Sequence, residues 1–216
     1  VRHKNRRCFK MREVTLEELH QIASDSREAI WEDARGEGRD VKLYLHWTAG
    51  KYHTKYEDYH INIDGDGRIF VTADDLSTKL SHTYMRNTGS VGIAVDCAYG
   101  AGSSDLGEYP PTAAQIETMA KVICVVAEAL WLTIDKDHVM THGEAANNED
   151  GDYRWHKPYA WWNDGYGDGD TRGDLEYLGT DESPSYNPFA EDGSRGGDVL
   201  RGKANWYKDH GLMDNL

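Results

Sequence analysis

Two histidines and one aspartate are the residues of this 216-residue chain whose types and positions suit metal chemistry. His46 and His142 each end a predicted apolar strand, and Asp174 lies where an acidic, glycine-rich stretch returns to apolar sequence. In α/β sheets, strand ends are where sites assemble. Two imidazoles and a carboxylate leave one coordination position of Zn²⁺ open for water, which is typical of a catalytic zinc site. The chain has 10 histidines, which allow many pairings, so spacing alone does not select this set.

Apolar periodicity predicts the elements that would position these side chains. Capping boxes, formed by Thr15 with Glu18 and by Thr112 with Gln115, predict the starts of two amphipathic helices. The expected order is a helix over 15–35, a strand over 41–48, a hairpin over 59–72, a strand over 90–95, a helix after Pro110 and Pro111, a strand over 138–142, a long loop over 143–173 and a short closing helix near 201–207. This interleaving predicts one α/β domain with a mixed central β-sheet flanked by α-helices.

The charge balance limits the classes of partner. Lys and Arg total 24 against 38 Asp and Glu, which gives a net charge of -14. A basic face for phosphate groups is therefore not expected, and nucleic acid is disfavoured as a partner. No apolar stretch approaches the ~20 residues that span a bilayer, so membrane insertion is not expected. The basic N-terminus lacks the apolar core of a signal peptide, which predicts synthesis in the cytoplasm without a visible export signal.

Six short motifs occur in a fixed order between residues 41 and 178. They are Leu45-His46-Trp47-Thr48-Ala49-Gly50, Tyr59-His60-Ile61-Asn62-Ile63 with Asp66-Gly67, Ser81-His82, Ser90-Val91-Gly92-Ile93, Thr141-His142-Gly143-Glu144 and Arg172-Gly173-Asp174. This ordered set resembles the N-acetylmuramoyl-L-alanine amidases of type 2, a family similar in fold to peptidoglycan recognition proteins that includes many phage endolysins. The resemblance implies zinc-dependent hydrolysis of the amide bond between N-acetylmuramic acid and L-alanine in peptidoglycan.

The resemblance also implies roles for individual residues. His46, His142 and Asp174 would be the three zinc ligands. Tyr59 matches a family tyrosine that lies beside the zinc-bound water, and Arg172 lies where many members carry a catalytic lysine, so these two are the expected catalytic residues. A guanidinium stays charged throughout the working pH range. Arg172 would therefore stabilise an oxyanion without transferring a proton.

Substrate contacts and proton transfer are less fully determined by the motifs. His82 matches a histidine near the substrate groove of the family, and Glu144 is the other residue expected to bind substrate. Many members carry a glutamate where this chain has Ala94, and Asp96 is the nearest acid. Tyr59, Asp96 and Glu144 are all candidates for relaying a proton to the leaving amine, with Tyr59 the first choice because its motif match is closest.

Two other functions stay open at this point. A non-catalytic peptidoglycan-binding module would lack the third zinc ligand. A cell-wall glycosidase would need two carboxylates about 5 to 9.5 Å apart, which the acid-rich stretch after Glu144 could supply.

The expected organisation is one catalytic domain with a short extension. Residues 1–178 would form the zinc amidase domain, with an N-terminal arm and helix over 1–40 and a motif-bearing core over 41–178. Residues 179–216 would form a C-terminal extension packed on the same domain. The expected partner is peptidoglycan, that is, a glycan strand with its stem peptide, and a monomer is favoured. The protein would act on the cell wall, either as an endolysin after phage-type release or as an autolysin.

Overall fold

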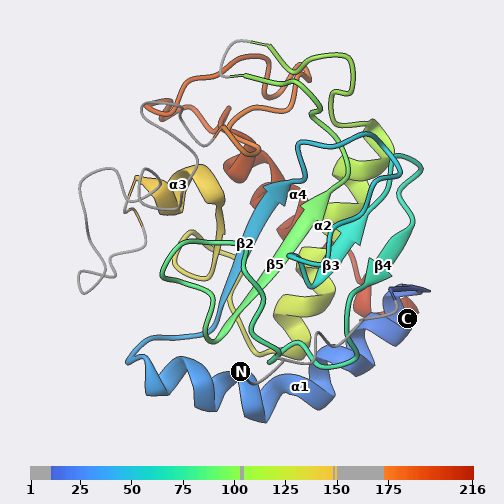
Figure 1. Cartoon of the computed structure of the whole chain (residues 1–216), viewed down its shortest axis with the longest axis vertical. Helices are drawn as coiled ribbons and strands as arrows, with labels where there is room; N and C mark the ends of the chain where they lie inside the picture. Colours follow the sequence, from blue (N-terminus) through green and yellow to red (C-terminus); the bar gives the residue numbers. More distant parts are fainter. Residues whose placement is uncertain (1–10, 103–104, 148, 150–172) are drawn as a thin grey trace, which may run out of the picture.

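A computed structural model of the chain describes residues 11–102, 105–147, 149 and 173–216 (Figure 1). Its elements are β1 (Arg12–Val14), α1 (Leu16–Gly36), β2 (Lys42–Trp47), β3 (Ile61–Ile63), β4 (Ile69–Val71), β5 (Ser90–Val95), α2 (Ala113–Ala129), β6 (Val139–Thr141), α3 (His142–Ala146), α4 (Gly196–Asp209) and the 3-10 helix η2 (Met213–Asn215). The two long helices and the hairpin that the sequence predicts are therefore confirmed.

The described strands form one mixed sheet in the order β1-β4-β3-β5-β2-β6. β2 runs parallel to both β5 and β6, and β3 is parallel to β5, whereas β4 is antiparallel to β1 and β3. Figure 1 shows β2 and β5 side by side in the centre, with α2 crossing behind them and α1 along one end of the sheet. This arrangement confirms the predicted α/β fold with helices flanking a mixed sheet.

The two faces of β2 have different neighbours. Leu43 and Leu45 are fully buried in the main hydrophobic core together with residues of α1 and α2, such as Ile123. Successive side chains of a strand point to opposite faces, so Tyr44 and His46 project from the face that α2 does not cover. Tyr44 packs there in a smaller buried cluster with residues of β6 and α3. His46 is therefore held by a strand that is buried on both faces.

Capping residues define where the helices begin. The Thr15 and Thr112 capping boxes start α1 and α2 as predicted. A third capping box, which the sequence analysis did not identify, joins Thr141 to Glu144 and begins α3 at His142. The prediction of a strand through His142 was therefore wrong at its end. The strand stops at Thr141 because this residue caps a helix, and His142 occupies the first helical position.

The C-terminal helix is longer than the sequence pattern indicated. It spans Gly196–Asp209 instead of a short piece near 201–207, and it packs on α2. Lys203 donates to Glu117 Oε1 over 2.7 Å, and the Tyr207 hydroxyl donates to Glu117 Oε2 over 2.6 Å. Among the helices that the structure describes, none combines the length and the apolar composition that a membrane span requires.

Candidate metal centre

Three side chains from separate parts of the chain meet at the end of β2. Asp174 Oδ2 lies 3.5 Å from His46 Nδ1 and 3.4 Å from His142 Nδ1. The exposed fraction is 0% for His46 and 6% for each of His142 and Asp174. One ligand atom from each residue lies within 4.8 Å of the other two. The predicted convergence of these residues is thus present in the folded chain.

The spacing of these atoms suits a tetrahedral ion. Zinc binds imidazole nitrogen and carboxylate oxygen at about 2.0–2.2 Å, which places neighbouring ligand atoms roughly 3.3 Å apart in tetrahedral geometry. The measured separations of 3.4 and 3.5 Å between Asp174 Oδ2 and the two Nδ1 atoms are close to that value. The donor set therefore fits a zinc ion with a fourth position left for solvent or substrate.

The charge state of Asp174 also suits a metal ligand. Burial by itself would raise the pKa of this carboxyl group, but the adjacent imidazoles of His142 and His46 lower it well below the ordinary value. Asp174 is therefore a carboxylate at neutral pH. A buried carboxylate next to two ring nitrogens provides the negative charge that a divalent cation requires.

Thr83 holds the other edge of the His46 ring. Its Oγ1 lies 3.4 Å from His46 Nε2 and 3.0 Å from His82 Nδ1. A hydrogen bond at one ring nitrogen selects the tautomer and turns the lone pair of the other nitrogen outward. With Nε2 toward Thr83, His46 presents Nδ1 to Asp174 and to a metal ion. The sequence analysis missed Thr83, although it directly follows the Ser81-His82 motif.

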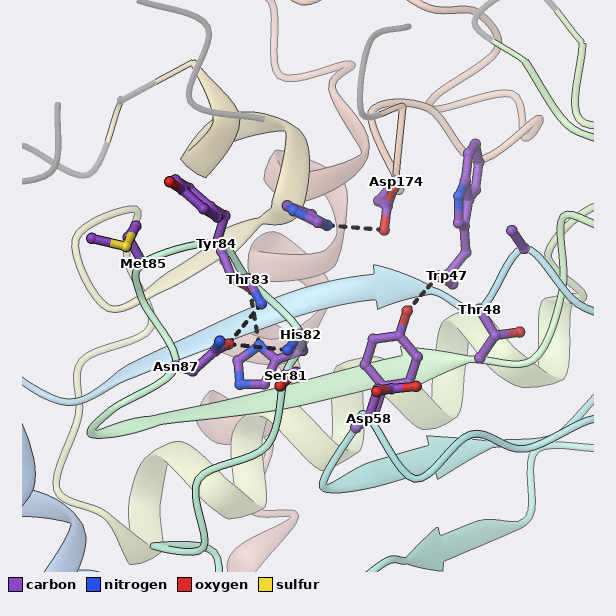
Figure 2. A pocket seen from close by; sticks show the side chains of 13 residues that line it. Trp47, Thr48, Asp58, Ser81, His82, Thr83, Tyr84, Met85, Asn87 and Asp174 are labelled. Carbon is purple, nitrogen blue, oxygen red and sulfur yellow. Dashed lines mark hydrogen bonds and ion pairs between the residues drawn. The ribbon is translucent and has the colours of Figure 1, made fainter. Parts of the chain in front are cut away.

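A pocket of about 460 Å³ opens beside this centre (Figure 2). Its lining residues are Trp47, Thr48, Ala49, Asp58, Tyr59, Ser81, His82, Thr83, Tyr84, Met85, Asn87, His142 and Asp174. Figure 2 shows Asp174 on one side of this space, with Ser81, His82 and Asn87 on the loop below it and Trp47 at the end of β2. The pocket is therefore lined by two of the three converging side chains, His142 and Asp174, whereas His46 is fully buried.

Tyr59 lines the pocket and packs against His46. Its ring centroid is 5.0 Å from that of His46, and its hydroxyl lies 3.5 Å from the backbone oxygen of Trp47. The next residue of the motif, His60, has a different environment. It is 1% exposed, and its ring nitrogens form hydrogen bonds with the backbone oxygen of Thr78 and the backbone N of Gly92. His60 is therefore a packed, structural histidine.

His82 lies on the floor of the pocket with only 7% of its surface exposed. Its ring centroid is 5.4 Å from that of His46. Burial, followed by the nearby rings of His46, His60 and His142, lowers the pKa of His82 well below its ordinary value. The ring is therefore neutral at physiological pH. Gly92 on β5 makes this close approach possible, because a Cβ there would lie 2.6 Å from His82 Cγ.

Glu144 occupies a different place from the one expected for a substrate-binding residue. It is 1% exposed and does not line the pocket. Its Oε2 accepts hydrogen bonds from Thr141 N at 2.8 Å and from Arg201 Nη1 at 2.8 Å, and its Oε1 accepts from Arg201 Nη2 at 2.9 Å. Burial raises the pKa of Glu144, but the hydrogen bonds and charge of Arg201 lower it below the ordinary value. Because both oxygens are engaged, Glu144 has a structural position that the sequence analysis did not anticipate.

The acid that follows β5 is buried away from the pocket. Asp96 is 0% exposed, and neither of its carboxyl oxygens has a hydrogen-bond partner in the described part of the chain. Burial raises the pKa of Asp96 to about 8, so the group is mainly protonated at neutral pH. Ala94 pairs with His46 in the sheet, so its methyl group stands on the face of the metal centre, at the position where the sequence resemblance implies a glutamate in other members.

A second set of potential ligands, His53, Asp64 and Asp66, lies at the β3–β4 turn. The carboxylate of Asp64 is already bound by Arg68, whose Nε lies 2.9 Å and whose Nη2 lies 2.7 Å from Asp64 Oδ2. It also accepts from the backbone N of Asp66. These contacts fix the turn, and they make Asp64 a poor ligand.

Arg172, the other expected catalytic residue, lies outside the described residues.

Comparison with known proteins agrees with the geometry. A family model described as N-acetylmuramoyl-L-alanine amidase matches residues 19–155, more than half of the chain. His46, Tyr59, His82 and His142 fall inside the matched range, whereas Asp174 lies beyond it and is brought to the other residues by the fold. No curated protein and no solved structure matches the chain.

Proposed function

The chain belongs to the N-acetylmuramoyl-L-alanine amidase family, and we propose that it hydrolyses the amide bond between N-acetylmuramic acid and L-alanine in peptidoglycan with one zinc ion bound by His46, His142 and Asp174. The observation that carries this proposal is the spacing of 3.4 and 3.5 Å between Asp174 Oδ2 and the two histidine nitrogens. This set suits a catalytic zinc ion because it supplies three ligands and leaves a fourth position open.

The chemistry divides between the metal ion and the protein. Zinc bound here would lower the pKa of a coordinated water to about 7 and polarise the substrate carbonyl. Tyr59, which lies next to His46 and lines the pocket, would hold its hydroxyl near the scissile bond and donate a hydrogen bond or a proton to the leaving amine. Arg172 would stabilise the negative charge that develops on the carbonyl oxygen, which is worth a few kcal/mol for a well-placed donor.

The remaining pocket residues would bind the substrate. Asp58, Ser81, Asn87 and His82 all offer polar groups to the pocket. A neutral His82 can donate or accept a hydrogen bond without carrying a charge. We therefore retain His82 as a substrate-binding residue for the peptide or the lactyl group. Glu144 is not included, because its carboxylate is bound to Arg201 and Thr141.

Two alternatives are less consistent with the geometry. A binding module without catalysis has no need for a third ligand, yet Asp174 contacts both histidines. A glycosidase needs two carboxyl groups facing one cleft. Among the residues that the structure describes, the acids that line the pocket are Asp58 and Asp174, and Asp174 is engaged by the two imidazoles.

Product analysis of digested peptidoglycan tests the proposal. An amidase releases intact stem peptides and leaves glycan without peptides, a glycosidase releases muropeptides, and a binding module releases neither. We expect mass spectrometry to detect free stem peptides with an L-alanine amino terminus, and we expect Asp174→Ala to release none. Muropeptides with reducing sugar ends, or no products from zinc-loaded protein, would refute the assignment.

A further inference from the structure

The side chain of Arg201 reaches from α4 to the segment that carries His142. Its guanidinium donates to both carboxylate oxygens of Glu144, over 2.8 and 2.9 Å, and to the backbone oxygen of Val139 over 2.9 Å. Glu144 also accepts from Thr141 N and so closes the capping box that starts α3. Arg201 therefore contacts residues on both sides of His142, one in β6 and one in α3.

Arg195, just before α4, makes an equivalent contact with the segment that carries Asp174. Its Nη2 donates to Glu176 Oε2 over 2.9 Å, and its Nε lies 3.2 Å from the same oxygen. The backbone N of Gly196 donates to the Glu176 backbone oxygen over 3.0 Å. Glu176 Oε1 accepts from Thr141 Oγ1 over 3.0 Å. Through these bonds, the segments that carry His142 and Asp174 are joined to each other and to α4.

The first residues of α4 allow this close contact because they lack side chains. A Cβ on Gly196 would lie 1.8 Å from the backbone oxygen of Leu175, and one on Gly197 would lie 2.9 Å from Glu144 Oε1. Leu175, which directly follows Asp174, has a φ of 59°. A non-glycine residue keeps such a conformation only when its surroundings hold it. The start of α4 is thus packed directly against the backbone next to Asp174.

We propose that α4 positions two of the three metal ligands. Arg201 orients His142 through Glu144, and Arg195 orients Asp174 through Glu176. Both arginines are only 6% exposed, and their carboxylate partners are buried as well. Groups that hydrogen-bond directly to metal ligands typically raise metal affinity about 10- to 100-fold, and the two arginines act one residue further from the ligands. The inference rests on the proposed zinc site, and it assigns a function to residues that follow the part of the chain matched by the family model.

Lysine substitutions provide the test. Arg201→Lys keeps the positive charge but cannot donate in parallel to both oxygens of Glu144. We expect it to raise the zinc Kd of the full chain several-fold, up to about tenfold. The Kd is measured by competition with a chelating dye, starting from metal-free protein whose folding is verified by circular dichroism. Arg195→Lys is expected to act in the same direction.

Lys203→Met is the matched control. Lys203 lies on the same helix and forms an ion pair, but its partner is Glu117 on α2 and neither residue contacts a ligand-bearing segment. We expect its zinc Kd to equal that of the wild type. Cobalt-substituted protein adds a second measurement, because the visible spectrum of Co²⁺ reports ligand geometry and should change in the arginine variants only.

The outcomes separate the two proposals. If wild-type protein binds no zinc, the proposed metal site fails, and this inference fails with it. If the wild type binds zinc and a folded Arg201→Lys or Arg195→Lys protein has the wild-type Kd, only the positioning role is refuted. If both lysine variants unfold, Glu144→Gln replaces them, because glutamine can retain the capping box. An unchanged zinc Kd and cobalt spectrum in that variant would then refute the role of Arg201.

Discussion

Replacing Thr83 with valine removes one hydrogen-bonding group from the metal centre while nearly preserving the shape of the side chain. Thr83 Oγ1 is 3.4 Å from His46 Nε2, which exceeds the usual range for a strong hydrogen bond. We therefore expect an effect at the lower end of that typical of groups that orient metal ligands, about a tenfold rise in zinc Kd, or ~1.4 kcal/mol. The assay is a zinc titration of metal-free protein against a competing chelator near pH 7.

Thr83→Ser is the matched control, because it keeps the hydroxyl group and removes only a methyl group. We expect its zinc Kd to stay close to that of the wild type. Thr83 is 3% exposed, so both variants are compared at a temperature where circular dichroism shows them folded. If Thr83→Val binds zinc as tightly as Thr83→Ser, the hydroxyl does not orient His46, and the reasoning from this contact is wrong.

Three further substitutions test other parts of the account. Tyr59→Phe should lower kcat more than about tenfold, a barrier change above ~1.4 kcal/mol, with unchanged zinc content; activity within that limit removes Tyr59 from proton transfer. Because burial raises the pKa of Asp96 to about 8, the folded state holds a proton that the unfolded state has lost above its ordinary pKa. The free energy of unfolding of the wild type should therefore fall between about pH 4 and pH 8, by up to ~1.4 kcal/mol per pH unit relative to that of Asp96→Asn. Chemical denaturation at pH 5 and pH 8 measures this difference, and the same difference between the two proteins at both pH values would contradict the prediction. Gly196→Ala places a Cβ 1.8 Å from the Leu175 backbone oxygen and should destabilise the fold. Gly202→Ala is the control on the same helix: its Cβ would have nothing within 4 Å, and it should stabilise the fold by about 0.5–1 kcal/mol. Equal melting temperatures of the two variants would refute the close contact at Gly196.

The elements that position His46 are predictable from local sequence. For an apolar strand with a histidine near its end, the alternation of side chains is enough to place the imidazole on one face of the sheet, close to the end of the strand. The helices after Thr15 and Thr112 are predictable for a similar reason, since a capping box is a local pattern. The same pattern is present at Thr141 and Glu144, and recognising it would have placed His142 at the start of a helix.

The supporting contacts of the site are not predictable in this way. Glu144 is predicted to bind substrate, but its partner Arg201 lies 57 residues further along the chain, and only the fold brings the two together. Thr83 approaches His46 across 37 residues for the same reason. β1 has three residues, too few to show a period, and it forms through pairing with β4. Interactions over such sequence separations depend on tertiary packing, which no local motif encodes.

The central claim is that His46, His142 and Asp174 bind one metal ion, and zinc stoichiometry tests it most directly. The purified chain is loaded with zinc, dialysed against metal-free buffer and measured by plasma mass spectrometry beside Asp174→Ala. We expect about one zinc per wild-type chain, as for a site with three protein ligands, and a clear loss of zinc from the variant while it remains folded. A wild type that retains no zinc, or an Asp174→Ala protein that retains as much as the wild type, would contradict the account.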